Sequence, residues 1–338
     1  MENLINNYNL IFGLSIFNLV SYLLLNKYKQ NLFFFLIDNP DKIRKLHSKP
    51  VLMIGGIFIA NYFIFTSVYS FLNGHISFSI ILFTSILVFF IGLIDDYYSL
   101  SAYKKLFFLS IISLIALNLE NSIRIETLYF STFERVLNVK EYSFFLTSLC
   151  ILLLINCLNL SDGINGLAVG ISIIWIMFNI YYANIFLTIM LVPLIFLLIL
   201  MFFSIFKEQF FLGDNGSLII SCFVGLVTIL NYNQNLLNND QKIISTENIF
   251  ILFMLPGLDM FRLFLERILK KKDPFKGDRN HLHHLLMKKF SLKSTLLIYL
   301  FLMIFFIFID QINLIPSIYI IIFFIIFYSF FIKVLKKI

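Results

Sequence analysis

Residues 184–204, NIFLTIMLVPLIFLLILMFFS, form an uncharged apolar run. As a helix, such a run spans the roughly 30 Å hydrocarbon core of a bilayer. The 338-residue chain is 60% hydrophobic and only 13% charged, against about 25% charged residues in soluble domains. We therefore predict an all-α polytopic integral membrane protein with a single membrane domain over residues 1–338. The eleven predicted transmembrane helices lie at about 8–26, 51–71, 78–94, 105–119, 143–159, 165–181, 184–204, 215–231, 248–268, 295–310 and 314–332.

The formal net charge is +7, and the distribution of the basic residues along the chain agrees with the predicted topology. With the N-terminus outside, the inner segments hold 22 Lys and Arg residues and the outer segments hold four. This asymmetry predicts a cytoplasmic C-terminus and insertion in a bacterial inner membrane. Attraction to anionic lipid heads is a secondary effect, and we expect no nucleic-acid partner. Of the outer connections, residues 120–142 include an amphipathic stretch that we expect at the membrane interface.

The first polar cluster ends the third predicted span and reads Gly92-Leu93-Ile94-Asp95-Asp96. Two adjacent carboxylates at a membrane surface repel each other and are costly to bury without a partner. A divalent cation or a proton-accepting role would offset that cost, although two solvated acids at a helix end would give the same pattern. Because neighbouring residues project about 100° apart on a helix, we expect the two acids to have different roles.

The second cluster, residues 156–167, reads NCLNLSDGINGL at the end of an apolar span. Asn156, Asn159 and Asp162 recur at three-residue intervals, which keeps them on roughly one side of a helix. Polar side chains at this depth face a cavity or another helix. Gly163 and Gly166 then allow a tight turn with close backbone approach to a ligand. Interhelical hydrogen bonding followed by an ordinary loop is the alternative.

The third cluster, residues 211–217, reads FLGDNGS. Asp214 stands before an apolar helix, where it is either an N-cap or part of a carboxylate site for Mg²⁺. Phe211 is a candidate for stacking on a planar base, but one of 43 phenylalanines packs in the core by default.

The fourth cluster, residues 273–284, holds three of the five histidines. These are His281, His283 and His284, and Arg279 precedes them. The flanking charge is positive, so diphosphate binding fits better than zinc ligation. A basic loop with no ligand is the alternative. The segment 38–50, with Arg44, Lys45 and His47, reads by itself as a basic juxtamembrane loop.

Together these segments resemble the polyprenyl-phosphate N-acetylhexosamine-1-phosphate transferases, a family that includes the phospho-N-acetylmuramoyl-pentapeptide transferases. The resemblance rests on five motifs in order: Pro-Asp followed by Arg-Lys-x-His and Gly-Gly, Gly-x-x-Asp-Asp, Asn-x-x-Asn-x-x-Asp-Gly, Gly-Asp-x-Gly-Ser, and Asp-x-x-His-x-His-His. It implies eleven spans with the N-terminus outside. It also implies transfer of a sugar-1-phosphate from a UDP-sugar to undecaprenyl phosphate at the cytoplasmic face, with release of UMP.

The resemblance assigns residues to roles as follows. Catalytic roles fall to Asp95, Asp96, Asp162 and His281. Asp95 and Asp96 would position or deprotonate the lipid phosphate, and the resemblance leaves open which of the two is the base. Asp95 and Asp214 would bind Mg²⁺, or Mn²⁺ in its place. Substrate contacts fall to Arg44, Lys45, His47, Lys105, Asn156, Asn159, Gly163, Asn165, Phe211, Arg279, His283 and His284.

Some positions depart from the family pattern. Asn165 stands where relatives carry a second Asp, and it keeps hydrogen-bonding capacity without the charge. Leu52 and Leu109 replace a common proline and glutamine. The His-x-His-His form resembles the branch that starts O-antigen, common-antigen and teichoic-acid synthesis, so UDP-N-acetylglucosamine (UDP-GlcNAc) is the expected donor.

Three alternatives remain open at this stage. A 6-deoxy N-acetylhexosamine donor would use the same chemistry. So would a pentapeptide transferase acting on a larger donor. A secondary transporter or lipid-phosphate carrier belongs to another class, and the gathering of polar clusters at one face without an internal repeat argues against it. The sequence leaves the oligomeric state open, a homodimer included.

Overall fold

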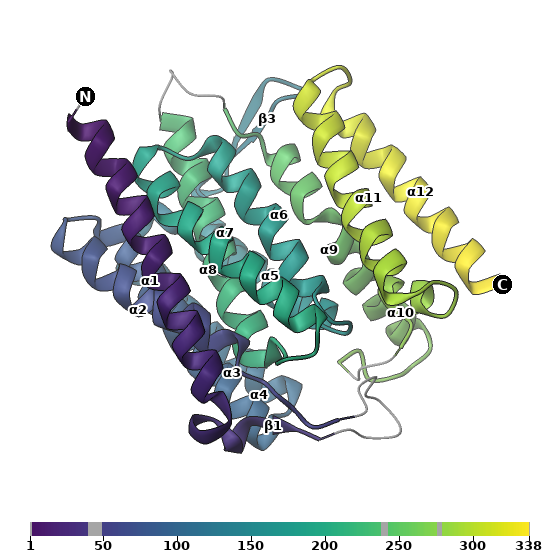
Figure 1. Ribbon diagram of the computed structural model, residues 1–338. Coiled ribbons are helices and arrows are strands. Elements are labelled where there is room, and N and C mark those ends of the chain that lie inside the picture. Colours follow the sequence, from purple (N-terminus) through teal and green to yellow (C-terminus); the bar gives the residue numbers. More distant parts are fainter. Residues whose placement is uncertain (1, 40–48, 238–242, 276–278, 338) are drawn as a thin grey trace.

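The computed structural model describes residues 2–39, 49–237, 243–275 and 279–337. Within them the chain is almost entirely helical (Figure 1). The helices are α1 (Glu2–Leu32), α2 (Gly55–Leu72), α3 (Ile76–Tyr98), α4 (Ala102–Leu119), α5 (Ser143–Ser161), α6 (Leu167–Tyr182), α7 (Ile185–Phe206), α8 (Gly213–Leu237), α9 (Thr246–Leu269), α10 (Leu282–Met287), α11 (Leu292–Ile312) and α12 (Ser317–Lys337).

The prediction of an all-α multi-pass membrane protein is confirmed. Among the described residues, ten helices are long and apolar enough to cross a bilayer, and α6 is a shorter apolar helix. Every predicted span corresponds to one of these eleven helices. Helices suit lipid because each backbone N–H and C=O finds its partner within the same segment.

The strands are short and lie outside the helical bundle. At one end, β1 (Ile37–Asp38) pairs antiparallel with β2 (Val51–Leu52). At the other end, β3 (Thr127–Phe130) and β4 (Arg135–Asn138) form an antiparallel hairpin within the stretch expected at the membrane interface. The carboxylate of Glu247, at the start of α9, accepts hydrogen bonds from the backbone N–H groups of Ser131 and Thr132 in the hairpin turn. The hairpin is thereby fixed to the bundle.

Helix α8 is the centre of the bundle. It is buried along almost its whole length, whereas α1, α11 and α12 expose most of theirs. Its first turn meets α3 backbone to backbone: a Cβ at Gly92 would lie 2.5 Å from the Cα of Asn215 and 2.7 Å from the carbonyl oxygen of Asp214. Real Cβ contacts are never that short. Glycine at this position therefore lets two helices approach closely, as in other membrane interfaces.

Side-chain amides connect α6 to α8 deeper in the bundle. Asn179 donates to the hydroxyl of Thr228, and Asn231 donates to the carbonyl of Asn179. Asn235 donates to the carbonyl of Tyr182. In hydrocarbon such bonds satisfy polar groups that have no water available.

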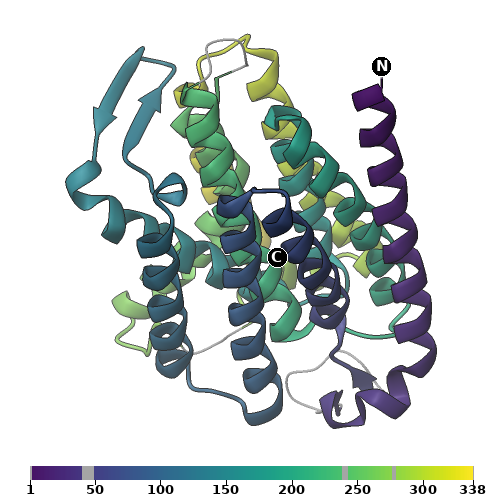
Figure 2. The same ribbon diagram turned by 90° about the vertical axis from the view of Figure 1, so that its left-hand side faces the viewer.

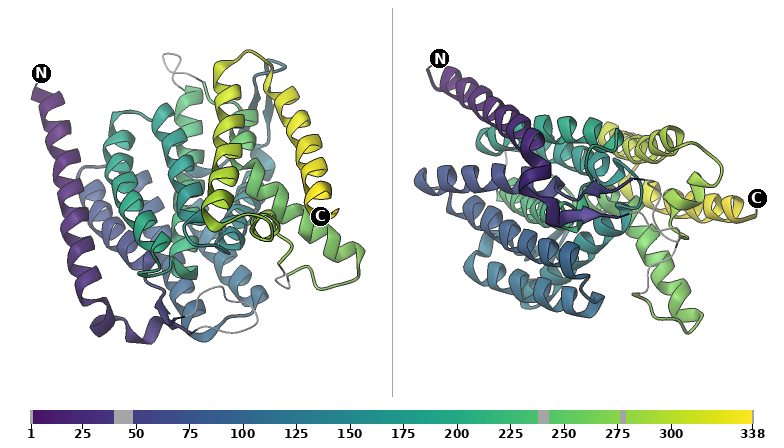
Figure 3. Two further views of the ribbon diagram at one scale, coloured as in Figure 1. Left: turned by 45° about the vertical axis from the view of Figure 1, so that its right-hand side comes forward. Right: turned by 60° about the horizontal axis from the view of Figure 1, so that its bottom comes forward.

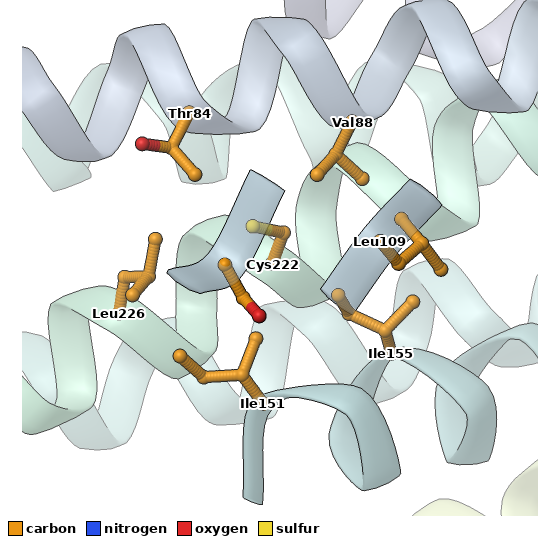
Figure 4. Close-up of a pocket in the computed structure, with 8 residues that line it drawn as sticks. Thr84, Val88, Leu109, Ile151, Ile155, Cys222 and Leu226 are labelled. Atoms are coloured by element: carbon orange, nitrogen blue, oxygen red, sulfur yellow. The ribbon is translucent and has the colours of Figure 1, made fainter. Parts of the chain in front are cut away.

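A small gap among α3, α4, α5 and α8 is lined mainly by apolar side chains, including Val88, Leu109, Ile151 and Leu226 (Figure 4). It has no room for a water molecule. It belongs to the packed core and is too small for a substrate.

The polar clusters gather at one end of the bundle. The N-terminus and the β3–β4 hairpin lie at the opposite end, as Figures 1 and 2 show. The C-terminal part of α9 projects from the side of the bundle near α10 (Figure 3), and Pro256 lies inside this helix. A proline inside a helix is a recognised cause of such bending.

The close contact at Gly92 generates the first prediction. Gly92→Ala should destabilise the protein by about 1–3 kcal/mol, because a methyl group there separates α3 from α8. The measurement is the Tm in detergent. Gly257→Ala, where a Cβ meets nothing within 4 Å, is the matched control and should leave the Tm unchanged or raised. Equal Tm values for Gly92→Ala and the control would contradict the prediction.

Candidate active site

Asp96 caps the start of α8. Its Oδ1 accepts a hydrogen bond of 2.9 Å from the backbone N–H of Asp214, and its Oδ2 accepts one of 2.9 Å from that of Asn215. The Asn215 side chain also donates to Oδ2. The first N–H groups of a helix have no partner within the helix, and negative charge is favoured there. Both carboxylate oxygens of Asp96 are therefore engaged in holding α8 against α3.

Asp95 faces another way and meets Lys105 of α4. The Lys105 ammonium forms an ion pair with Asp95 and a second one with Asp214 Oδ2 at 2.7 Å. The Asp95 side chain is 6% exposed and that of Lys105 is 14% exposed, whereas Asp214 is 34% exposed. The ammonium thus bridges two carboxylates, and Asp214 is the member open to a ligand. The adjacent acids thus have different partners, and their difference in role stays a prediction.

Asn159 of α5 completes the surroundings of Asp214. Its side-chain amide donates to Asp214 Oδ1 at 2.8 Å and lies 2.9 Å from the hydroxyl of Ser217. Three helices and the start of α8 therefore converge on one carboxylate.

Asp162 is the C-cap residue of α5 and belongs to the same group of acids. Burial raises the pKa of its carboxyl well above the usual value, and the negative charges of Asp214 and Asp96 raise this pKa further. Asp95, Asp96, Asp162 and Asp214 therefore form one group of carboxylates, and the ammonium of Lys105 lies within it. Such an excess of negative charge is unfavourable unless protons or cations offset it.

The carboxylates of Asp95 and Asp214 suit a hard divalent cation. Mg²⁺ is commonly held by one or two carboxylates, with water and substrate phosphates completing its shell. The position between the two acids attracts a cation, since Lys105 places its ammonium there. Within the described ranges, no group of three or more His, Cys, Asp or Glu side chains forms a complete metal site. The two carboxylates of Asp95 and Asp214 are the donor set that a Mg²⁺ ion would use here.

The histidine segment packs against the turn that follows Asp162. A Cβ at Gly163 would collide with Nε2 of His283 and would lie 3.1 Å from Nε2 of His284. His283 is 1% exposed, and burial lowers its pKa well below the usual value, with the neighbouring histidines adding to the effect. The close approach requires glycine at position 163. The structure thus brings the second and fourth sequence clusters together.

His281 is held by α9. Its Nδ1 lies 2.8 Å from Oδ2 of Asp259 in α9. Its ring stacks on that of His283 with centroids 5.6 Å apart.

Other predicted site residues lie farther from the acids. Asn156 donates to the carbonyl of Leu152 in its own helix, and Asn165 donates to the carboxylate of Glu208 at 3.2 Å. The backbone of Phe211 pairs with Met53 beside β2, and Arg279 is exposed. Arg44, Lys45 and His47 lie outside the described residues.

The predicted set omitted three residues that the structure places at or beside the site. Asn215 and Ser217 lie within the quoted third cluster but received no role. Asp259 was missed altogether, although an acid within an apolar span is a recognised sign of a functional position.

The comparisons with known proteins agree with this geometry. A model described as glycosyl transferase family 4 matches residues 78–232. Over these residues the chain is therefore similar to glycosyl transferase family 4. The match includes the four carboxylates and Lys105, and it ends before the histidine segment.

Relatives match over a longer part of the chain. Undecaprenyl-phosphate alpha-N-acetylglucosaminyl 1-phosphate transferase of Thermotoga maritima is 26% identical over 78% of this chain and 76% of its own length. The proteins of that name from Escherichia coli O157:H7 and Yersinia pestis are each 27% identical over 75% of this chain, covering 69% and 70% of their own lengths. The likeness to these transferases thus extends beyond the residues that the family model matches.

The raised pKa of Asp162 leads to a prediction about stability and pH. A carboxyl whose pKa is higher in the folded than in the unfolded state loses stabilising free energy as the pH rises above its unfolded value. Asp162→Asn cannot ionise, so it should raise the Tm in metal-free buffer. The gain should be small at pH 5 and larger at pH 8. A gain that is constant with pH, or a loss that grows with pH, would contradict the assignment.

Proposed function

We propose that this protein transfers N-acetylglucosamine-1-phosphate from UDP-GlcNAc to undecaprenyl phosphate. In the reaction, an oxygen of the lipid phosphate forms a bond to the phosphorus that carries the sugar. The bond from that phosphorus to the bridging oxygen breaks, and UMP leaves with the oxygen. The names of the relatives support this assignment. The observation that carries it is the Lys105-bridged pair of Asp95 and Asp214 at one end of a lipid-exposed bundle.

The charge of the site fits two anionic reactants only when cations are present. Asp95 and Asp214 are the residues that would hold Mg²⁺. The cation would neutralise charge on the phosphate oxygens and on the leaving UMP. Lys105, already between these acids, would contact an adjoining phosphate oxygen. Asp96 would keep the first turn of α8, and so Asp214, in position.

Asp162 suits the role of proton acceptor. A carboxyl with a raised pKa is a stronger base than an ordinary one once it is ionised. It lies close enough to Asp96 and Asp214 for their charges to act on it. We therefore assign it to receive the proton of the lipid phosphate. His283 and His284, packed on Gly163, would line the side that receives the donor.

We further propose that the site faces the cytoplasm of a bacterial inner membrane. The positive-inside asymmetry supports this orientation. A water-soluble UDP-sugar is available on that side, and the polyprenyl tail stays in lipid. Product formation here would begin cell-envelope polysaccharide synthesis, such as that of O-antigen.

The reaction itself gives the third prediction. Purified protein with undecaprenyl phosphate, UDP-GlcNAc and Mg²⁺ should release UMP, and EDTA should abolish the release. Asp214→Asn should lower kcat/KM by roughly 100-fold or more, because it removes a charge that would act on the phosphates. UMP release is followed by a coupled or chromatographic assay.

Two controls accompany that assay. Asp310→Asn changes another buried acid, 1% exposed and remote from the site, and should keep its activity. A donor panel with UDP-N-acetylmuramoyl-pentapeptide and 6-deoxy N-acetylhexosamine donors identifies the sugar. If folded protein releases no UMP from any of these donors, the transferase assignment is wrong.

Labelling of introduced cysteines tests the orientation. Cys150, which is exposed on α5, is first replaced by Ser. Ser131→Cys in the hairpin turn should then react with a membrane-impermeant maleimide in intact cells. Ser101→Cys, at the start of α4 beside the site, should react only after permeabilisation. The reverse pattern would place the site outside.

A further inference from the structure

Asp259 is an acid within a membrane-spanning helix, only 3% exposed. Its Oδ1 accepts from the hydroxyl of Tyr328 at 2.6 Å and from the guanidinium of Arg262 at 2.9 Å. The backbone N–H of Leu282, the first residue of α10, lies 3.0 Å and 3.1 Å from the two oxygens. An acid in a membrane-spanning helix is expensive, is normally paired and is a candidate functional position. Here its contacts converge on the segment that carries His281.

The contact with His281 leaves one ring atom unused. Nδ1 is held by Asp259 Oδ2 at 2.8 Å. Nε2 is buried and has no hydrogen-bond partner among the described residues. Buried polar atoms are nearly always paired, so an orphan beside a proposed substrate site indicates a missing ligand. A neutral imidazole with its proton on Nδ1 presents a lone pair at Nε2, whereas an imidazolium presents a proton there.

We propose that Asp259 is a positioning residue that orients His281 so that its Nε2 binds an anionic phosphate oxygen of the UDP-sugar. This inference rests on the proposed function. It adds to that function a buried acid on α9 that meets the substrate only through the histidine.

The charges around the ring are consistent with this role. Donation from Nε2–H to a phosphate while Nδ1–H donates to Asp259 requires the imidazolium, and the carboxylate of Asp259 supplies its counter-charge. Arg262 and Tyr328 contact the carboxylate, and Nε2 of the ring keeps no hydrogen-bond partner among the described residues. Figure 1 shows the helices that contribute these groups, α9, α10 and α12, side by side at the site end of the bundle.

A purely structural role makes a different prediction. Asp259 also fixes the start of α10 through Leu282, so its loss would loosen that segment whether or not His281 is present. A double-mutant cycle separates the two roles, because only a residue that acts through His281 loses its effect when His281 is removed.

The cycle uses Asp259→Asn, His281→Ala and the double variant in the intact protein. The amide keeps an acceptor oxygen for Leu282 and Tyr328 while removing the charge. Asp259→Asn should lower kcat/KM for UDP-GlcNAc roughly 10- to 100-fold, the usual cost of losing a partner that orients a functional imidazole. In the His281→Ala background the same change should cost no more than about twofold. Asp259→Glu should recover part of the activity.

A second readout keeps the inference separate from the proposed reaction. Calorimetric binding of UDP-GlcNAc is measured for the same four proteins, with Tm and monodispersity as checks on folding. Asp310→Asn is the matched control for loss of a buried acid and should leave binding unchanged. Independent effects of Asp259→Asn and His281→Ala, in turnover or in binding, would overturn the positioning role.

Measurements on the wild-type protein separate failure of the proposed function from failure of the inference about Asp259. Donor binding without UMP release would reject the proposed function, and the binding cycle would still decide the role of Asp259. Failure of the folded wild-type protein to bind UDP-GlcNAc would overturn both proposals.

Discussion

The buried start of α8 is the constraint on which the site depends. A helix that begins within a membrane protein must find acceptors for its first N–H groups, since lipid supplies none. Asp96 meets this need from α3 with both carboxylate oxygens. The hydrogen bonds require the two helices to approach closely, and Gly92 permits that approach. Because Asp214 is in the capped turn and Asp95 precedes Asp96, the same contact sets the two proposed cation ligands facing each other.

Hydrophobic run length was enough to predict the helices, because each span must cover the same thickness of hydrocarbon. The acid clusters were also apparent, since charge at the end of an apolar span is costly and therefore informative. The pairing of residues more than one hundred positions apart was not accessible from spacing. Lys105 and Asp214 meet because α4 and α8 both pack against α3 and α5, and no local pattern in the sequence specifies that contact. Asp259 and His281 are closer in the sequence, but their contact also depends on how the segment after α9 folds back on that helix.

The placement of Asn156 shows where periodicity fails. Residues at i, i+3 and i+6 drift by about 60° per step, so Asn156 and Asp162 project about 120° apart on α5. Asn159 reaches Asp214, whereas Asn156 bonds to its own helix. Asp259 was overlooked for a different reason: followed by Arg262 three residues later, it resembles an ordinary ion pair on a helix surface. Burial of the acid, which the sequence does not display, distinguishes the two cases.

Four acids are gathered where two anionic reactants are proposed to meet. Without positive charge nearby, these carboxylates would repel both reactants. Lys105 supplies a single positive charge between Asp95 and Asp214, and the α8 N-terminus is already occupied by Asp96. The remaining imbalance favours either a proton on Asp162 or a cation shared between carboxylates and phosphates. A proton on Asp162 suits the site before substrate binds, and a shared cation suits the site with substrate bound. Binding of the cation and substrate would then favour ionisation of Asp162, so the proposed base would gain its charge when its acceptor substrate is present.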